Sequence, residues 1–131
     1  MANSLRTKPI DLFASPWTAP AWMKSNNDLI GQGYLLPEYY DVWAKYFVKF
    51  LDEYKRQGIE FWGLTTQNEP LNGNVPNFGF NAMGWNSTSQ REWIVEHLGP
   101  ALEDAGYSNI NLMILDDQRP LVPKWAREVF F

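Results

Sequence analysis

Residues 63–70, GLTTQNEP, join a run of strand-forming residues directly to Asn-Glu-Pro. The run begins upstream at Ile59, in IEFWGLTT, and has the apolar composition and length of a buried strand. Pro70 cannot donate a hydrogen bond to a sheet, so the strand must end before it, and the proline restricts the backbone of Glu69. The segment therefore predicts a strand that ends in an acidic residue, Glu69, whose backbone is restricted by the following proline.

Two more apolar runs of strand length lie on either side, IDLFASPW at residues 10–17 and INLMILDD at residues 110–117. Helical patterns follow each of the three runs. Apolar residues recur at steps of three and four across residues 37–58, which begin with a proline and end at a glycine. Two long segments rich in Gly, Asn and Pro are predicted to be loops: residues 18–36, before this helix, and residues 71–86, after the strand that ends in Asn-Glu-Pro.

The second helical pattern spans residues 87–106, where Ser87 and Gln90 fit a capping box. Gly99-Pro100 falls inside this pattern and is expected to bend or split the helix. A third helix is expected to begin at Pro123. The predicted order is strand, helix, strand, helix, strand, helix.

Alternation of this kind predicts an α/β fold with a parallel sheet whose strands are covered on both faces. A doubly wound sheet would fit the same order, but no glycine-rich phosphate loop follows any of the strands. A (β/α)8 TIM barrel is therefore favoured, with about three consecutive β/α units present. Because a complete barrel needs about 250 residues, we expect residues 1–131 to be a single, incomplete domain, a fragment of a larger barrel.

The composition excludes several classes of function. A net charge of −4 without clusters of Lys and Arg argues against nucleic acid. With no cysteine and one histidine, His97, the chain has neither a disulfide framework nor a multi-histidine metal site. No apolar run reaches the roughly 20 residues of a transmembrane helix, and residues 1–17 lack the apolar core of a signal peptide. Aromatic residues make up 16% of the chain and suit a sugar or lipid cleft as well as a core.

Glu69 is the first candidate for chemistry, because a partly desolvated carboxyl at a strand end suits a general acid. Asn68 beside it can bond a substrate hydroxyl; equally, Asn-Glu-Pro can simply end the strand, with Asn68 forming a turn. Asp116 and Asp117 end the third strand, and alternation allows only one of them to point into a barrel. A structural network in which Arg119 pairs with one of them is favoured over direct catalysis.

Aromatic residues and a sequon complete the candidates. Trp17 follows Ser-Pro at the end of the first strand, so it is either a core ring or the wall of a cleft. Phe78 and Phe80 lie in the loop at residues 71–86, where we expect them to face substrate or form a lid. His97 is expected on the surface or between helices. Asn86, in Asn86-Ser87-Thr88, is a potential N-glycosylation acceptor.

Five ordered blocks of this sequence resemble the glucosylceramidases, the lysosomal acid β-glucosidases of glycoside hydrolase family 30. The blocks are LFASPWTAPAWMK, WAKYFVKFLDEY, FWGLTTQNEP, QREWIVEHLGPAL and LMILDDQRPLVPKWA. The resemblance implies a (β/α)8 barrel that cleaves the β-glucosyl bond of glucosylceramide with retention and without a cofactor. It further implies a lysosomal location, a glycolipid substrate at a membrane surface, and a lysosomal activator protein as a candidate partner.

By motif position, the resemblance makes Glu69 the acid/base, Asn68 the residue that bonds the sugar 2-hydroxyl, and Trp17 part of the glucose pocket. It places Phe78 and Phe80 at the mouth of the cleft. Asp116 and Asp117 match a strand end near the family site, and we expect them to contribute to substrate binding.

Retaining hydrolysis needs two carboxyls about 5–5.5 Å apart, and the family's nucleophile, a second glutamate, would lie beyond Phe131. We therefore expect residues 1–131 alone to be inactive. The alternative is a carbohydrate- or lipid-binding pseudoenzyme that retains half a pocket. A family 30 xylanase is disfavoured by the SPWTAP and LDDQRP blocks.

Overall fold

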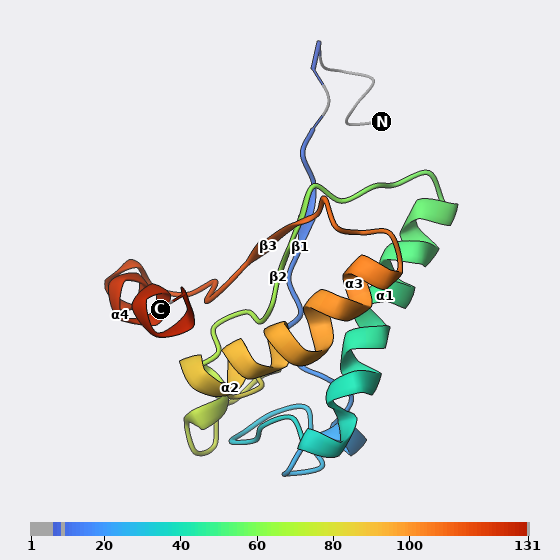
Figure 1. Cartoon of the computed structure of the whole chain (residues 1–131). Coiled ribbons are helices and arrows are strands. Elements are labelled where there is room, and N and C mark those ends of the chain that lie inside the picture. Colours follow the sequence, from blue (N-terminus) through green and yellow to red (C-terminus); the bar gives the residue numbers. More distant parts are fainter. Residues whose placement is uncertain (1–6, 9, 131) are drawn as a thin grey trace.

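A computed structural model describes residues 7–8 and 10–130 of the chain. Three short parallel strands, β1 (Phe13–Ala14), β2 (Gly63–Thr65) and β3 (Asn111–Met113), form one sheet in the order β1-β2-β3. The longer helices are α1 (Tyr40–Arg56), α2 (Ser87–Trp93), α3 (Gly99–Asp104) and α4 (Val122–Phe130). Each strand is followed by helix, which confirms three consecutive β/α units (Figure 1).

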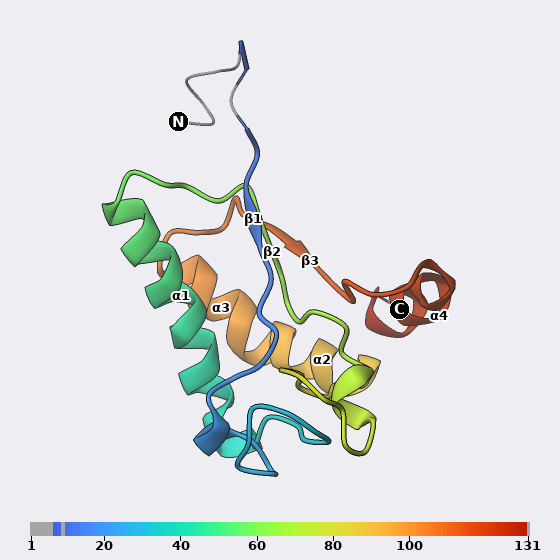
Figure 2. The same cartoon turned by 180° about the vertical axis from the view of Figure 1, so that it is seen from behind.

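The strands are shorter than predicted, and only β2 is buried along its whole length. The expectation that both faces of every strand are covered is wrong for β1, where Phe13 is 57% exposed. The helices cover one face of the sheet: Leu64 from β2 lies in the core, and Ala14 and Leu112 of the neighbouring strands pack against it. The opposite face, which includes Phe13, has no comparable layer of helices among the described residues (Figures 1 and 2).

The core lies between the sheet and two helical segments. Helix α1 buries Trp43, Ala44, Phe47 and Leu51 on one side, as its apolar periodicity predicts. Phe47 meets Trp93 of α2 edge to face, with ring centroids 5.5 Å apart. A 3₁₀ turn, Pro37–Tyr39, leads into α1, and the chain leaves it at Gly58, which has a φ of +76°. The helix predicted over residues 37–58 is thus confirmed.

The second helical segment is continuous but changes pitch. Helix α2 runs into a π-helical turn, Ile94–Leu98, and then into α3. Pro100 has no N–H to donate, so a disturbance of the α-helical hydrogen bonds is expected here. The cap lies one residue earlier than predicted: Asn86 Oδ1 accepts from the N–H of Ser89, 2.8 Å away, and Ser89 Oγ lies 3.3 Å from the Asn86 nitrogen. Asparagine and serine are about equally good N-caps, and Asn86 takes this position because the buried Ser87 donates to Glu128 of α4 instead.

Helix α4 lies at the far end of the sheet and packs against α2 (Figures 1 and 2). Trp125 Nε1 donates to Gln90 Oε1 at 3.0 Å, and Ser87 Oγ donates to Glu128 Oε2 at 2.5 Å. Within the described range, no helix has both the length and the apolarity needed to cross a membrane.

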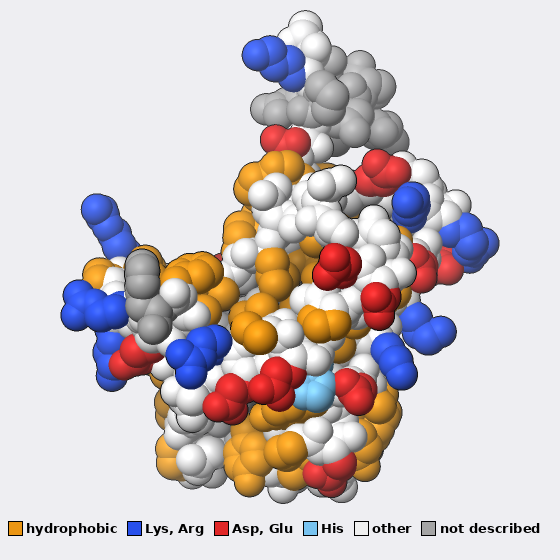
Figure 3. All heavy atoms as spheres, in the orientation of Figure 1, with side chains coloured by type: hydrophobic (Ala, Val, Ile, Leu, Met, Phe, Trp, Pro, Cys, Tyr) orange, Lys and Arg blue, Asp and Glu red, His pale blue; other side chains and the backbone are white. Residues whose placement is uncertain are grey.

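His97 joins the two helical segments, as expected for an interhelical histidine. Its Nδ1 lies 2.6 Å from Asp41 Oδ1 in the first turn of α1, and its ring meets Tyr40 edge to face. Figure 3 shows acidic side chains on both sides of the histidine. The hydrogen bond from His97 lowers the pKa of Asp41 below 3.8, and the charge of Lys45 acts in the same direction.

This pair makes stability depend on pH. Because the pKa of Asp41 is lowered in the folded chain, the pair stabilises the fold above pH 3.8, and this contribution is lost as pH falls through the lowered pKa. We expect Asp41→Asn to lower the free energy of unfolding at about pH 5, and this effect to shrink as pH falls through the lowered pKa of Asp41. Urea unfolding followed by tryptophan fluorescence measures this. Asp104→Asn, on the exposed end of α3, is the control; an equal effect of both variants would contradict the prediction.

The loops at residues 18–36 and 71–86 are tied to each other below the carboxyl ends of β1 and β2 (Figure 1). The N–H of Gly33 donates to Gly73 O at 2.9 Å, and the N–H of Gly84 donates to Gly33 O at 2.7 Å. Lys24 is 2% exposed, and its Nζ donates to the carbonyls of Asp28, Leu29 and Ala82 at 2.6, 3.1 and 2.8 Å. The ammonium group therefore holds both loops from within.

Gly73 is required by this close approach. A Cβ at position 73 would lie 1.9 Å from the nitrogen of Gly84, which is backbone and cannot rotate away. We expect Gly73→Ala to lower the free energy of unfolding by about 2 kcal/mol, as overpacking does. Gly79→Ala is the matched control, because nothing lies within 4 Å of its Cβ position. Urea midpoints of the two variants test this, and similar midpoints would count against it.

Candidate active site

Glu69 is held between its two neighbouring strand ends. Its N–H donates to Asp116 O, at the end of the third strand, at 3.0 Å. The N–H of Asn68 donates to Pro16 O, at the end of the first strand, at 2.9 Å. Both Asn68 and Glu69 are half-buried. The backbone of the Asn-Glu pair is thus fixed from both sides, and Glu69 is not turned out into bulk water.

The strand ends at this site adopt left-handed backbone conformations. Glu69 has a φ of +40°, Leu115 of +71° and Asp116 of +42°. This region costs about 1 kcal/mol or more for a residue with a Cβ, so it persists only where surrounding contacts enforce it. Such outliers concentrate at functional sites, and here two of them are the hydrogen-bonded pair Glu69 and Asp116.

The side chain of Glu69 has a partner that the sequence reasoning missed. Asn72 Nδ2 donates to Glu69 Oε2 at 2.7 Å. Asn72 stands three residues after Glu69, on the 3₁₀ turn Asn72–Asn74 that follows Pro70. A proline followed closely by Asn and Gly predicts a turn, and this turn returns the amide to the carboxylate. The bond orients one carboxylate oxygen and leaves Oε1 without a hydrogen bond among the described residues.

Asp116 and Asp117 lie beyond the end of β3, so strand alternation does not set their directions, and they have different hydrogen-bond partners. Asp116 Oδ2 accepts from Ser15 Oγ at 2.5 Å, and Ser15 also bonds Thr65, so one polar side chain from each strand end joins this group. Asp117 Oδ1 accepts from the N–H of Gln118 in a local turn. In the described chain Arg119 forms no ion pair with either aspartate, so the expected Asp–Arg network is absent there.

The aromatic candidates form one group beside the strand ends. The rings of Trp17 and Phe80 are 5.8 Å apart, and those of Phe80 and Phe78 are 4.5 Å apart. Trp17 and Phe80 are each 49% exposed, so neither is a core ring. Gln67, which is fully buried, donates from Nε2 to Trp17 O at 2.9 Å and fixes the backbone that carries this ring. Phe80 is exposed and Phe78 half-buried, and their expected role toward substrate stays a prediction.

The remaining candidate, Asn86, belongs to another element, the N-cap of α2, where it is exposed. What the strand ends bring together is a carboxylate, an amide, a second carboxylate and exposed aromatic rings. A carboxylate can transfer a proton, amides and carboxylates bond sugar hydroxyls, and aromatic faces cover the C–H face of a pyranose.

A family model described as "Glycosyl hydrolase family 30 TIM-barrel domain" matches residues 1–131. Among curated proteins, lysosomal acid glucosylceramidase of Mus musculus is 42% identical over 132 residues, covering 98% of this chain and 25% of the mouse protein. Putative glucosylceramidase 4 of Caenorhabditis elegans is 43% identical over 125 residues, covering 92% of this chain and 24% of the nematode protein. The chain thus spans about a quarter of the length of these relatives.

Solved structures with the same fold include that of SrfJ from Salmonella typhimurium. The two superpose with a TM-score of 0.84 at 34% identity, over 92% of this chain and 26% of the other. An endo-1,6-β-D-glucanase of Trichoderma harzianum, BGN16.3, is 36% identical over 110 residues, which are 76% of this chain and 22% of the fungal protein.

Proposed function

The chain belongs to glycosyl hydrolase family 30, and from this premise we propose that residues 1–131 are the acid/base-bearing part of a barrel that hydrolyses the β-glucosyl bond of glucosylceramide. Within the proposal the substrate is a glycolipid at a membrane surface and the location is lysosomal, in accord with the mouse relative's name. The observation that carries the proposal is the fixation of the Asn68–Glu69 backbone between two strand ends, the first of which leads directly into the exposed Trp17.

Glu69 would act twice in a retaining mechanism. As an acid it protonates the glycosidic oxygen, so that ceramide leaves as an alcohol while a second carboxylate attacks the anomeric carbon. As a base it then takes a proton from the water that releases glucose. Asn72 holds Oε2, which leaves Oε1 to carry the proton. We propose that the nucleophile is a glutamate of another barrel strand, outside residues 1–131.

The neighbouring residues would bind and orient the glucosyl group. Asn68 precedes the acid and is assigned the sugar 2-hydroxyl, whose hydrogen bond strengthens in the transition state. Trp17 offers an exposed ring face for the pyranose. Asp116 and Asp117 are assigned hydroxyl contacts, and Asp116 also holds the backbone of Glu69.

Phe80 and Phe78 continue the group of aromatic rings that begins at Trp17, with Phe80 exposed and Phe78 half-buried. A lipid-linked sugar has an apolar aglycone, so we assign these two rings to the ceramide side of the cleft. The lysosomal activator protein stays a prediction.

A chimera tests the proposed function. In it, residues 1–131 replace the matching quarter of mouse lysosomal acid glucosylceramidase, and a second chimera carries the corresponding segment of a nematode relative as a folding control. We expect the first chimera to release glucose from glucosylceramide and residues 1–131 alone to release none. Binding without hydrolysis by a folded chimera would favour the pseudoenzyme alternative. Hydrolysis of a β-1,6-glucan in its place would move the substrate class to that of the fungal relative.

A further inference from the structure

Asn86 stands outside the proposed catalytic group, at the loop that enters α2. The sequence there, Asn86-Ser87-Thr88, has the spacing of an N-glycosylation acceptor with a non-proline middle residue. Such triplets also arise by chance, so the acceptor has to be accessible as well. Asn86 and Thr88 are both exposed, while Ser87 between them is 7% exposed and bonds Glu128.

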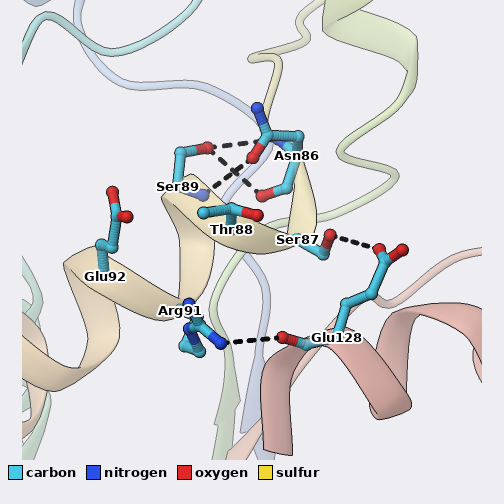
Figure 4. A pocket seen from close by; sticks show the side chains of 7 residues that line it. All are labelled: Asn86, Ser87, Thr88, Ser89, Arg91, Glu92 and Glu128. Atoms are coloured by element: carbon cyan, nitrogen blue, oxygen red, sulfur yellow. Dashed lines mark hydrogen bonds between the residues drawn. The ribbon is translucent and has the colours of Figure 1, made fainter. Parts of the chain in front are cut away.

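The acceptor atom is available in the folded chain. Asn86 uses its Oδ1 to cap α2, accepting from the N–H of Ser89. Its Nδ2 makes no hydrogen bond with any described residue, and Figure 4 shows the side-chain nitrogen pointing away from α2 and α4. The backbone at Asn86 is extended, with φ −105° and ψ 167°, so the side chain lies at the N-terminus of α2 and not on its side.

Glycosylation and capping do not compete for the same atom. The transfer replaces one hydrogen on Nδ2 and leaves the amide oxygen as an acceptor, so the bond from Ser89 survives. The hollow beside Asn86, of about 610 Å³, is lined by polar and charged side chains that include Arg91, Glu92 and Glu128 (Figure 4). The first sugars would therefore contact hydrophilic surface and not the core.

We propose that Asn86 is an N-glycosylation site of the chain when it passes through a secretory pathway, as the proposed lysosomal location requires. The donor is an oligosaccharyl diphospholipid. Asn86 Nδ2 attacks the anomeric carbon, the C–N bond forms as the C–O bond to the diphosphate breaks, the lipid diphosphate leaves, and the amide proton passes to a base of the transferase.

The test expresses residues 1–131 in cultured animal cells behind a cleavable secretion signal, with a C-terminal tag that carries its own sequon. The tag glycan marks every molecule that has met the transferase. We expect the wild type and Thr88→Ser to carry two glycans, as measured by gel mobility before and after amidase deglycosylation. We expect Thr88→Ala and Asn86→Asp to carry the tag glycan alone.

Asn86→Asp separates the two roles of the side chain, because aspartate keeps the N-cap and loses the acceptor nitrogen. Wild-type molecules that carry only the tag glycan would overturn the proposal. So would a second glycan that persists in Asn86→Asp. Neither result bears on hydrolysis, so failure here is distinguishable from failure of the proposed function, which the chimera tests separately.

Discussion

Replacing Glu69 with glutamine in the active chimera is expected to reduce hydrolysis of glucosylceramide by roughly 10²- to 10⁴-fold, the usual contribution of a positioned general acid or base. Glutamine keeps the shape of the side chain and its contact with Asn72, but it cannot deliver or accept the proton. The loss should fall on kcat more than on KM, because the residue acts on the reacting bond and not on the bound sugar. Released glucose, measured at saturating and limiting substrate, gives both constants.

Leaving-group dependence makes this prediction specific. An activated aryl β-glucoside departs without full protonation, so its cleavage to the glycosyl-enzyme should suffer less in Glu69→Gln than cleavage of glucosylceramide. Glu60→Gln is the matched control, because Glu60 is an exposed glutamate just before β2, at the opposite end of the strand from Glu69. Equal losses for the two substrates would argue that the variant misfolds. Full activity toward glucosylceramide would remove Glu69 from the mechanism.

The order of strands and helices followed from the sequence because its signals are local. Proline and glycine bound the helix over residues 37–58, and apolar runs bounded by polar turns locate the three strands. The lengths of the strands could not be predicted from the sequence. They depend on how β1 and β3 pair with β2, and these strands are far apart in the chain, beyond the reach of a local pattern. The exposure of Phe13 has the same origin: an apolar run predicts that a face will be covered, but not by which segment.

The site was predicted as a set of residues but not as a set of contacts. Glu69 and Asp116 are 47 positions apart in the chain, and the parallel register of β2 and β3 is what brings the carbonyl of one to the N–H of the other. The left-handed conformations of Leu115 and Asp116 had no signal, because neither residue is a glycine. The contact between Asn72 and Glu69 could have been predicted, because Asn72 lies in a turn three residues after Glu69.

We expect Lys24→Met to lower the free energy of unfolding by about 3 kcal/mol. The sequence did not indicate that Lys24 is buried, since a single lysine in a long loop is usually solvated. The substitution fills the same space but leaves the buried carbonyl of Ala82 without its Lys24 donor, and an unsatisfied buried group costs about 1–3 kcal/mol. It also removes two charge-assisted hydrogen bonds, to the part-buried carbonyls of Asp28 and Leu29. The cost is partly offset because a charge no longer has to be buried. Urea unfolding followed by tryptophan fluorescence measures the change.

The pH dependence identifies the cause of that loss. Burial lowers the pKa of Lys24 below 10.5, and the carboxylate of Asp28 only partly opposes this. The unfolded chain therefore binds more protons than the folded chain between the lowered pKa and 10.5, so wild-type stability should rise with pH through this window. Lys24→Met should lack that rise, whereas Lys45→Met, an exposed position on α1, should keep it and change stability by less than about 0.5 kcal/mol. A rise that persists in Lys24→Met would mean that another group titrates in this window and would contradict the prediction.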